Sequence, residues 1–356
     1  TKTLILARDR YGIKPMYYFR NDKSFVFGSE IKALFCNPEV RVQINKKGLL
    51  EYLTFQNFLS NQTLFENVNI LNPGTFLIIN SDNKIKEQTY WDFSFEDTLN
   101  QQKPLNHYIE KCDFLLNQSI KRQLISDVEI GTYLSGGMDS GTITALASKN
   151  LSYLRSFTCG FDLNSASGIE MGMDERENAE LMSYLFKTEH YEVILKAGDM
   201  ERIINKLVWH IEEPRVGQSY PNYYVAQLAS KFCKVVLSGD GGDELFAGYP
   251  WRYYRAVNNV SYDDYVKKYF NFWQRLVPSE LYSSLFKPIL NEVSDLKVYD
   301  LFRNIFKNQE SYFNKPEDYI NHSLYFESKT FLHGLLTVED KISMSHSLET
   351  RVPFLD

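Results

Sequence analysis

The sequence has few cysteines and few tryptophans, and this scarcity excludes some protein classes. Only four residues of each type occur among its 356 positions. The cysteines, Cys36, Cys112, Cys159 and Cys233, are scattered and form no C-x-x-C pair, which fits neither a zinc site nor a disulfide framework. We therefore predict reduced thiols and a cytoplasmic location.

Basic runs and long apolar runs are missing as well. The formal net charge is -6, and no cluster of lysine or arginine provides the basic surface that a nucleic-acid groove needs. No apolar run approaches the roughly 20 residues that span a bilayer, and no signal peptide opens the sequence. The composition, 44% hydrophobic and 24% charged, is typical of a folded protein. We expect its partners to be small molecules, with no nucleic acid and no membrane.

Strand and helix patterns divide the chain into regions. Strand-like segments such as KTLILARD and FLIIN dominate residues 1–92, and the polar residues 93–104 are typical of a linker. Within residues 105–356, strands and helices alternate first, which predicts an α/β fold with a parallel sheet and helices on both faces. The later part is mainly helical, and its aromatic run at 262–273 is predicted to form the core of a helical region.

The segment YLSGGMDSGT combines a strand end, two glycines and a helix start. The preceding DVEIGTYL is typical of a strand, and apolar residues recur at helical spacing after Asp139 or Ser140. The N–H groups and the dipole of a helix N-terminus attract an anion, and Gly136 and Gly137 let the backbone approach a phosphate closely. The segment therefore predicts a phosphate site, although SGG alone also occurs in plain tight turns.

A second glycine-rich loop, in VVLSGDGGDELFAGY, follows another predicted strand. It carries Asp240, Asp243 and Glu244, and acids beside a phosphate site would repel a nucleotide unless Mg²⁺ lay between them. Such a loop is also a common solvated turn, but both loops fall at carboxyl ends of strands, where ligands of parallel sheets bind. The lysine of G-x-x-x-x-G-K-[ST] and the pattern G-x-G-x-x-G are absent. We predict a nucleotide site of another type.

Four groups of motifs, in the same order, resemble the glutamine-dependent asparagine synthetase family. They are ARDRYGIKPMYY with FVFGSEIKAL, then SGGMDS, SGDGGDELFAGY and SMSHSLETRVPFLD, and the resemblance covers essentially the whole chain. It implies that residues 1–92 are the C-terminal portion of a class II glutamine amidotransferase domain of the N-terminal-nucleophile type. It also implies that residues 105–356 are an ATP-binding synthetase domain of the adenine nucleotide alpha hydrolase type, truncated at its C-terminus.

The resemblance further implies a ligase that uses ATP and Mg²⁺. In the family, the β-carboxylate of aspartate attacks the α-phosphorus of ATP and expels pyrophosphate. Ammonia derived from glutamine then converts aspartyl-AMP to asparagine and AMP. A loop of backbone N–H groups suits this chemistry, because the leaving pyrophosphate carries most of the developing charge.

The family motifs assign site residues position by position. Asp139 and Asp243 are the implied Mg²⁺ ligands, and Asp240 is the implied acid that holds or deprotonates the incoming ammonia. Position 240 is often glutamate in the best-known relatives, and here it is aspartate, one methylene shorter. The residues implied to hold ATP, through backbone groups or hydroxyls, are Leu134, Ser135, Gly136, Gly137, Asp139, Ser140, Cys159, Ser238 and Gly239. Cys159 is expected to be a small core residue rather than a nucleophile.

The acceptor pocket is expected to involve the segment HIEEPRVGQSYPNY and the end of the chain. Arg215 would pair with an α-carboxylate in bidentate fashion, and a solvated loop arginine is the competing interpretation. Glu349 and Arg351 would help shape the same pocket, and a structural ion pair is the competing interpretation.

We expect the sequence to be an internal part of a longer protein. It begins in a strand-like segment, so Thr1 is not expected to act as an N-terminal nucleophile. Neither the cysteine nucleophile of the family nor the lysine that supports its phosphates is among these residues, so full catalysis by this part alone is not expected.

Three functions stay open. The first is asparagine synthetase, and the second is an amidotransferase of the same family that acts on another carboxylate, for example a sugar acid in surface-polysaccharide assembly. The third is a nucleotide-binding relative without catalysis, against which the intact SGGMDS and SGDGGDE motifs argue. The oligomeric state is not determined by the sequence, and a homodimer is one candidate.

Overall fold

The computed structural model describes residues 2–81, 84–93, 103–165, 174–215, 219–257, 261–306 and 316–356. Most of the predicted linker 93–104 lies outside these residues. Contacts divide the chain into two compact units, each made of three segments. Unit 1 comprises Thr1–Asp97, Glu212–Gly217 and Tyr249–Thr337, and unit 2 comprises Thr98–Ile211, Gln218–Gly248 and Val338–Asp356.

Unit 1 contains two antiparallel sheets of three strands each. The first has the order β1 (Thr3–Ala7), β5 (Thr75–Asn80), β6 (Ile85–Thr89), and the second has the order β3 (Phe25–Gly28), β2 (Tyr17–Arg20), β4 (Val68–Ile70). Strand β5 alternates buried and partly exposed residues, which is the pattern of a strand with one face on a core.

An aromatic core joins several helices of unit 1. Phe55, Tyr269, Phe302 and Phe326 are all at most 2% exposed and pack with one another in a single cluster. The aromatic run at 262–273 is part of this core, as its pattern predicts. The helices are α1 (Ile31–Leu34), α2 (Lys46–Phe55), α9 (Pro250–Val257), α10 (Tyr262–Trp273), α11 (Tyr282–Leu285), α12 (Leu290–Val293), α13 (Val298–Asn304), α14 (Pro316–Lys329) and the first half of α15 (Phe331–Met344).

Packing therefore groups the helical segment differently from the sequence-based division. That division placed residues 249–337 with the parallel sheet, whereas α2 shares its buried face with α10, α13 and α14. An amphipathic helix is stabilised by whichever apolar surface covers it, and sequence order alone does not show which surface that is.

Unit 2 contains a five-stranded sheet in which every neighbouring pair is parallel. The order is β11 (Glu349–Arg351), β10 (Val235–Leu237), β7 (Ile130–Tyr133), β8 (Arg155–Phe161), β9 (Glu189–Leu195). The chain moves outward from β7 to β9 and then returns to the other side of β7 as β10. The sheet thus has a topological switch point between β7 and β10, and ligands of such sheets bind at the carboxyl ends of the strands there.

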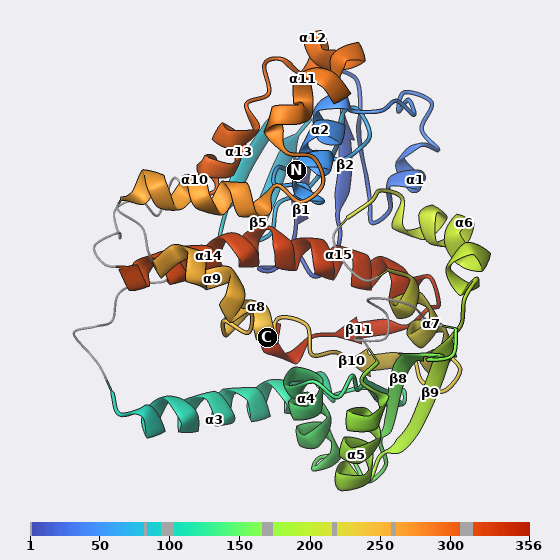
Figure 1. Ribbon diagram of the computed structural model, residues 1–356. Helices are drawn as coiled ribbons and strands as arrows, with labels where there is room; N and C mark the ends of the chain where they lie inside the picture. The colour runs from blue at the N-terminus through green and yellow to red at the C-terminus, as the bar shows by residue number, and fades with distance from the viewer. Residues whose placement is uncertain are drawn as a thin grey trace. The chain divides into compact units, whose positions relative to one another are not determined.

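Helices cover both faces of this sheet, which confirms the predicted α/β fold. Val236 belongs to one apolar cluster and Val235 and Leu237 belong to another, since successive side chains of a strand point to opposite faces. Figure 1 shows α3 (Leu105–Gln123), α4 (Met138–Ser148) and α5 (Arg176–Phe186) on one side of the sheet and α7 (Ser219–Ala229) on the other. The remaining helices are α6 (Asp199–Ile211), the short α8 (Gly242–Leu245) and the second half of α15. Within the described ranges, no helix is long and apolar enough to cross a membrane.

Candidate functional site

The first glycine loop connects β7 to α4. Leu134 extends the strand, because its N–H donates to the carbonyl of Phe157 on β8 at 2.9 Å. Gly136 has φ of 85°, and a Cβ there would lie 2.7 Å from the Cβ of Asn178, so this position requires glycine. Helix α4 then begins after Gly137 without any side-chain cap. The N–H groups of its first turn are therefore available to an anion at the carboxyl end of β7.

Two serines hold this loop in shape. The Ser135 N–H donates to Ser140 Oγ at 3.0 Å, and the two hydroxyl oxygens are also 3.0 Å apart. The Gly137 N–H donates to Ser135 Oγ at 3.2 Å, and the Glu175 carboxylate hydrogen-bonds to the same side chain. The loop is thus preorganised by short local bonds, which lowers the entropic cost of binding a phosphate.

The second glycine loop follows β10. The Ser238 N–H donates to the carbonyl of Arg351 on β11 at 2.8 Å, and the Ser238 hydroxyl donates to Asp240 Oδ2 at 3.0 Å. Gly241 has φ of 94°, and its N–H donates to a carboxylate oxygen of Glu244 at 3.2 Å. The turn therefore holds Asp240 near the strand end and starts α8 one residue after Gly241.

The two loops are in direct contact. The Asp243 N–H donates to Asp139 Oδ2 at 2.9 Å. A Cβ on Gly242 would lie 2.2 Å from the same oxygen, and a Cβ on Gly239 would lie 2.8 Å from the Ser140 nitrogen. The glycines in the second loop are therefore required because the first loop lies against them. The structure brings together the residues that the motifs assign to phosphate and metal binding.

Acidic side chains crowd this contact. Burial, and then the charges of Asp243 and Asp240, raise the pKa of Asp139 to about 6, although the Asp243 N–H opposes the shift. No group of three or more metal-binding side chains is found in the described part of the chain. Mg²⁺ commonly takes only one or two carboxylates and completes its shell with phosphate oxygens and water. Asp139 and Asp243 therefore fit a magnesium ion that arrives with a nucleotide, and they stay predicted ligands.

The residues predicted to contact adenosine lie on neighbouring strands. The Thr158 hydroxyl donates to the Leu134 carbonyl, so Cys159 follows directly beside the end of β7. Burial, and then the charge of Asp174, raise the pKa of the Cys159 thiol to about 12. A thiol that stays protonated at neutral pH is a poor nucleophile, in agreement with the expectation that Cys159 is a packing residue.

The charged groups of Glu349 and Arg351 bind each other and the end of a helix. The Arg351 Nε donates to Glu349 Oε1 at 2.9 Å, and its Nη1 donates to the carbonyls of Gln123 and Ile125 at the end of α3. Arg351 thereby caps a helix C-terminus, where a cation is favourable. These contacts favour the structural ion pair over a substrate role, which remains a prediction.

Arg215 is buried in unit 1, whereas both glycine loops belong to unit 2. Its guanidinium donates twice to Glu213 Oε1, at 2.7 and 3.1 Å, and lies 4.8 Å from the ring centroid of Phe58. The interpretation as a solvated loop arginine is therefore wrong. Its pairing with an acceptor carboxylate stays a prediction.

One acid near the site, Glu339, was not among the residues predicted from the sequence. Glu339 on α15 is 7% exposed, and its two oxygens accept hydrogen bonds from Thr350 and Asn222. Burial, and then the charge of Asp240, raise its pKa to about 8. The available signal was the charged triplet EDK inside the apolar helix FLHGLLTVEDKISM, since consecutive charges at core positions need a reason to be there.

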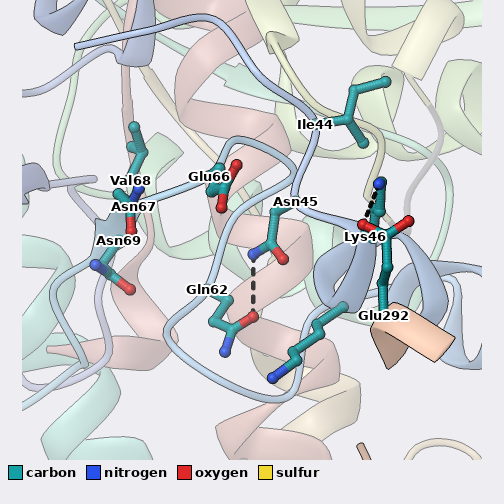
Figure 2. Close-up of a pocket in the computed structure, with 10 residues that line it drawn as sticks. Ile44, Asn45, Lys46, Gln62, Glu66, Asn67, Val68, Asn69 and Glu292 are labelled. Atoms are coloured by element: carbon teal, nitrogen blue, oxygen red, sulfur yellow. Dashed lines mark hydrogen bonds and ion pairs between the residues drawn. The ribbon is translucent and has the colours of Figure 1, made fainter. Parts of the chain in front are cut away.

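A cavity of about 360 Å³ in unit 1 does not offer comparable chemistry (Figure 2). Four of its polar side chains form two pairs with one another. Asn45 Nδ2 donates to Gln62 Oε1 at 3.0 Å, and Lys46 forms an ion pair with Glu292. We therefore locate the candidate site at the two glycine loops of unit 2.

A parallel sheet with two touching glycine loops at its switch point defines an α/β protein whose ligand is expected at the carboxyl ends of the strands. The family model described as asparagine synthase matches residues 111–356, and the one described as glutamine amidotransferase domain matches residues 1–91. The chain therefore belongs to the asparagine synthase family, and its first 91 residues match a glutamine amidotransferase domain. Both matches confirm the resemblance of its motifs.

Curated relatives agree with this assignment. A putative glutamine-hydrolyzing asparagine synthetase 2 of Methanocaldococcus jannaschii is 32% identical over 90% of this chain and 60% of its own length. Glutamine-hydrolyzing asparagine synthetase 1 of Bacillus subtilis is 28% identical over 98% of this chain and 57% of its own. A more distant relative, amidase chyE of Penicillium rubens, is 26% identical over 69% of this chain and 38% of its own. The chain spans about 60% of the length of the first of these relatives.

Proposed function

We propose that this chain carries the ATP-dependent, amide-forming site of a glutamine-hydrolysing asparagine synthetase. The observation that supports it most is the contact of the two glycine loops through the Asp243 N–H and Asp139 Oδ2, 2.9 Å apart, at the switch point of a parallel sheet. It joins an anion-binding helix start to a set of carboxylates, as a magnesium–nucleotide complex requires.

In this proposal each loop has a separate task. The first turn of α4 and the hydroxyls of Ser135 and Ser140 hold the β- and γ-phosphates, with Gly136 and Gly137 permitting close approach. Asp139 and Asp243 hold Mg²⁺, which when bound neutralises charge on the leaving pyrophosphate. The backbone groups of Leu134, Cys159, Ser238 and Gly239 hold adenosine. Binding the leaving group through preorganised donors favours attack of a carboxylate on the α-phosphorus.

The acceptor in this proposal is the β-carboxylate of aspartate, and the nitrogen comes from glutamine through the amidotransferase part of the whole protein. The proposed role of Asp240, in the loop that follows β10, is to hold or deprotonate the nitrogen that attacks the acyl-adenylate. The substrates are small molecules, and the proposed place of action is the cytoplasm.

A second candidate keeps the chemistry and changes the acceptor. Its support is that position 240 is aspartate rather than glutamate, and that a relative of this chain is named an amidase. In this version the site would amidate another carboxylate, for example a sugar acid. A relative without catalysis is the least favoured function, because both acid-bearing loops are intact.

The test uses the full-length gene product with ATP, Mg²⁺, aspartate and ammonium, since ammonium replaces the glutaminase reaction. Pyrophosphate release is followed continuously and asparagine is identified by mass spectrometry. Aspartate-dependent pyrophosphate release together with asparagine supports the first candidate. Release that depends on a different carboxylic acid supports the second, and ATP binding without release for any acid refutes both.

A further inference from the structure

Glu339 is a buried acid that the proposed chemistry does not yet use. Both of its carboxylate oxygens accept hydrogen bonds from neutral donors, Thr350 Oγ1 on β11 at 2.9 Å and Asn222 Nδ2 on α7 at 3.1 Å. Two elements therefore fix the carboxyl group, and it is 7% exposed as a residue. Hydrogen bonds from neutral groups lessen the cost of burying a carboxylate without balancing its charge.

The same hydrogen bonds bring Glu339 to the strand ends of the site. Thr350 pairs with Val236 of β10 in the parallel ladder, and the next β11 carbonyl, that of Arg351, accepts the Ser238 N–H at 2.8 Å. Asp240 follows two residues later, and its Oδ2 accepts the Ser238 hydroxyl at 3.0 Å. Glu339 is thus held through β11 beside β10, the strand that leads into the Asp240 loop, and the charge of Asp240 raises the pKa of Glu339.

Repulsion and burial govern how this pair binds protons. Burial first, then Asp240 and the neighbouring Asp340, raise the pKa of Glu339 to about 8, while Thr350 and Asn222 oppose the shift. Burial also raises the pKa of Asp240, and its hydrogen bond from Ser238 opposes that shift. Two interacting carboxyls of this kind lose their protons in two separated steps that belong to the pair.

The side chain of Tyr133, at the end of β7, also interacts with both carboxyls. Burial, and then the charges of Glu339 and Asp240, hold the pKa of Tyr133 well above its usual value. Tyr133 is therefore neutral at physiological pH and adds no charge. Two further acids act on the pair: Asp340 raises the pKa of Glu339, and Asp139, whose own pKa is raised to about 6, interacts with Asp240 across the two loops.

We propose that Glu339 and Asp240 act as one carboxyl pair, and that this pair accepts the proton lost by the attacking nitrogen. The inference rests on the proposed function. In the step, the ammonia lone pair forms the C–N bond to the acyl carbon, and the C–O bond to AMP breaks with its electron pair on the phosphate oxygen. The nitrogen loses one proton to the ionised member of the pair, which later releases it to water.

The pair is better suited to this task than an isolated carboxylate. A general base is most effective when its pKa lies near the working pH, and a solvated aspartate, with a pKa of about 4, is too weak. Burial first, and then repulsion by Asp240, raise the pKa of Glu339 into the neutral range. Glu339 therefore raises the basicity of the site through its charge. A neutral side chain at this position would not do so.

The deciding variant is Glu339→Gln in the full-length protein, because glutamine preserves the size of the side chain. Acceptor-dependent exchange of labelled pyrophosphate into ATP, which reports adenylation alone, should stay within about 3-fold of wild type. Amide formation with ammonium should fall about 10- to 100-fold. The acidic limb of its pH–rate profile should move to lower pH by about one unit, because Asp240 then titrates without its charged neighbour.

The matched control is Glu201→Gln, at an exposed position on α6, which should leave both reactions and the pH profile unchanged. Equal losses in exchange and amide formation with an unmoved pH limb would mean a structural role and overturn the proposal. Unchanged amide formation in the Glu339→Gln variant would overturn it as well. Absence of acceptor-dependent exchange in the wild type would instead refute the proposed function itself.

A second variant tests the pair in the opposite direction and does not depend on the folding of the first. Thr350→Val removes a donor that lowers the pKa of Glu339, and valine suits a buried strand. The acidic limb of amide formation should therefore move to higher pH, opposite to the shift with Glu339→Gln. Shifts in the same direction for both variants would contradict the carboxyl pair.

Discussion

Two buried acids of unit 1 differ from the acids of the candidate site in unit 2. In unit 1, Glu213 pairs with Arg215 at 2.7 Å, and Glu327 pairs with Arg252 at 2.8 Å. In unit 2, the neighbours that shift the pKa of Asp139 and of Glu339 are other acids and neutral hydrogen-bond donors. An acid balanced by an arginine of the same unit is part of the scaffold. An acid whose charge is balanced only when a metal, a substrate or a proton arrives marks a functional site.

This difference between the acids predicts that substitutions in the two units affect different properties. Removing an acid of the candidate site in unit 2 should affect chemistry and leave the fold intact, whereas removing an arginine partner in unit 1 should affect the fold and leave the candidate site intact. Four substitutions test this contrast, beginning with the largest expected effect.

Asp139→Asn should reduce pyrophosphate release by about 1,000-fold, because it removes a predicted Mg²⁺ ligand. The free energy of unfolding should be unchanged or higher, since folding raises the pKa of Asp139 and so disfavours its charged form. Pyrophosphate assay and urea unfolding measure the two effects. Asp127→Asn, at an exposed position, is the matched control. Turnover at the wild-type rate would refute the assigned site.

Arg252→Met should lower the free energy of unfolding by about 3 kcal/mol, because Glu327 would stay buried without its cation. The loss should shrink as the pH falls toward the usual pKa of glutamate, since protonated Glu327 has no charge to balance. Urea unfolding at several pH values measures this. ATP affinity of the folded variant should match wild type, and a large loss of affinity would weaken the division between the units.

Gly242→Ala should reduce pyrophosphate release by about 100-fold, because a misplacement of about 1 Å at a reacting centre has that order of effect. The added Cβ would lie 2.2 Å from Asp139 Oδ2 and must push the two loops apart. Gly198→Ala is the control for added volume at a glycine, because no atom lies within 4 Å of its Cβ position, although its positive φ makes that change mildly destabilising. Equal activity of the two variants would contradict the loop contact.

Arg351→Met should have the smallest effect, a loss of less than about 1 kcal/mol in the free energy of unfolding. Its ion pair with Glu349 is partly exposed, with the arginine side chain 22% exposed, and its other donors cap α3. The KM for the acceptor acid should not change. A rise of 10-fold or more in that KM would restore the substrate role that the sequence analysis predicts for Arg351.

The arrangement of the glycine loops was the part of the candidate site best predicted from sequence. A strand end, two glycines and a helix start are all encoded within about ten residues, so the positions of Gly136, Asp139 and Ser140 could be predicted from local sequence, while their roles stay predictions. Glu339 could not be found this way, because its partners Thr350 and Asn222 lie 11 and 117 residues away along the chain. The interpretation of Arg215 as solvated failed for a similar reason, since its burial depends on residues far along the chain.

The sequence by itself determined the local elements: the alternation that makes the parallel sheet, the glycines at its strand ends and the acids that follow them. Periodicity and turn chemistry act over a few residues and can be read directly. Only the tertiary structure decided which acids meet, which of them find an arginine, and where the helices of residues 249–337 bury their aromatic faces. Those outcomes follow from burial and charge pairing between distant segments. These contacts contribute to the free energy of folding only when the segments meet in the folded chain.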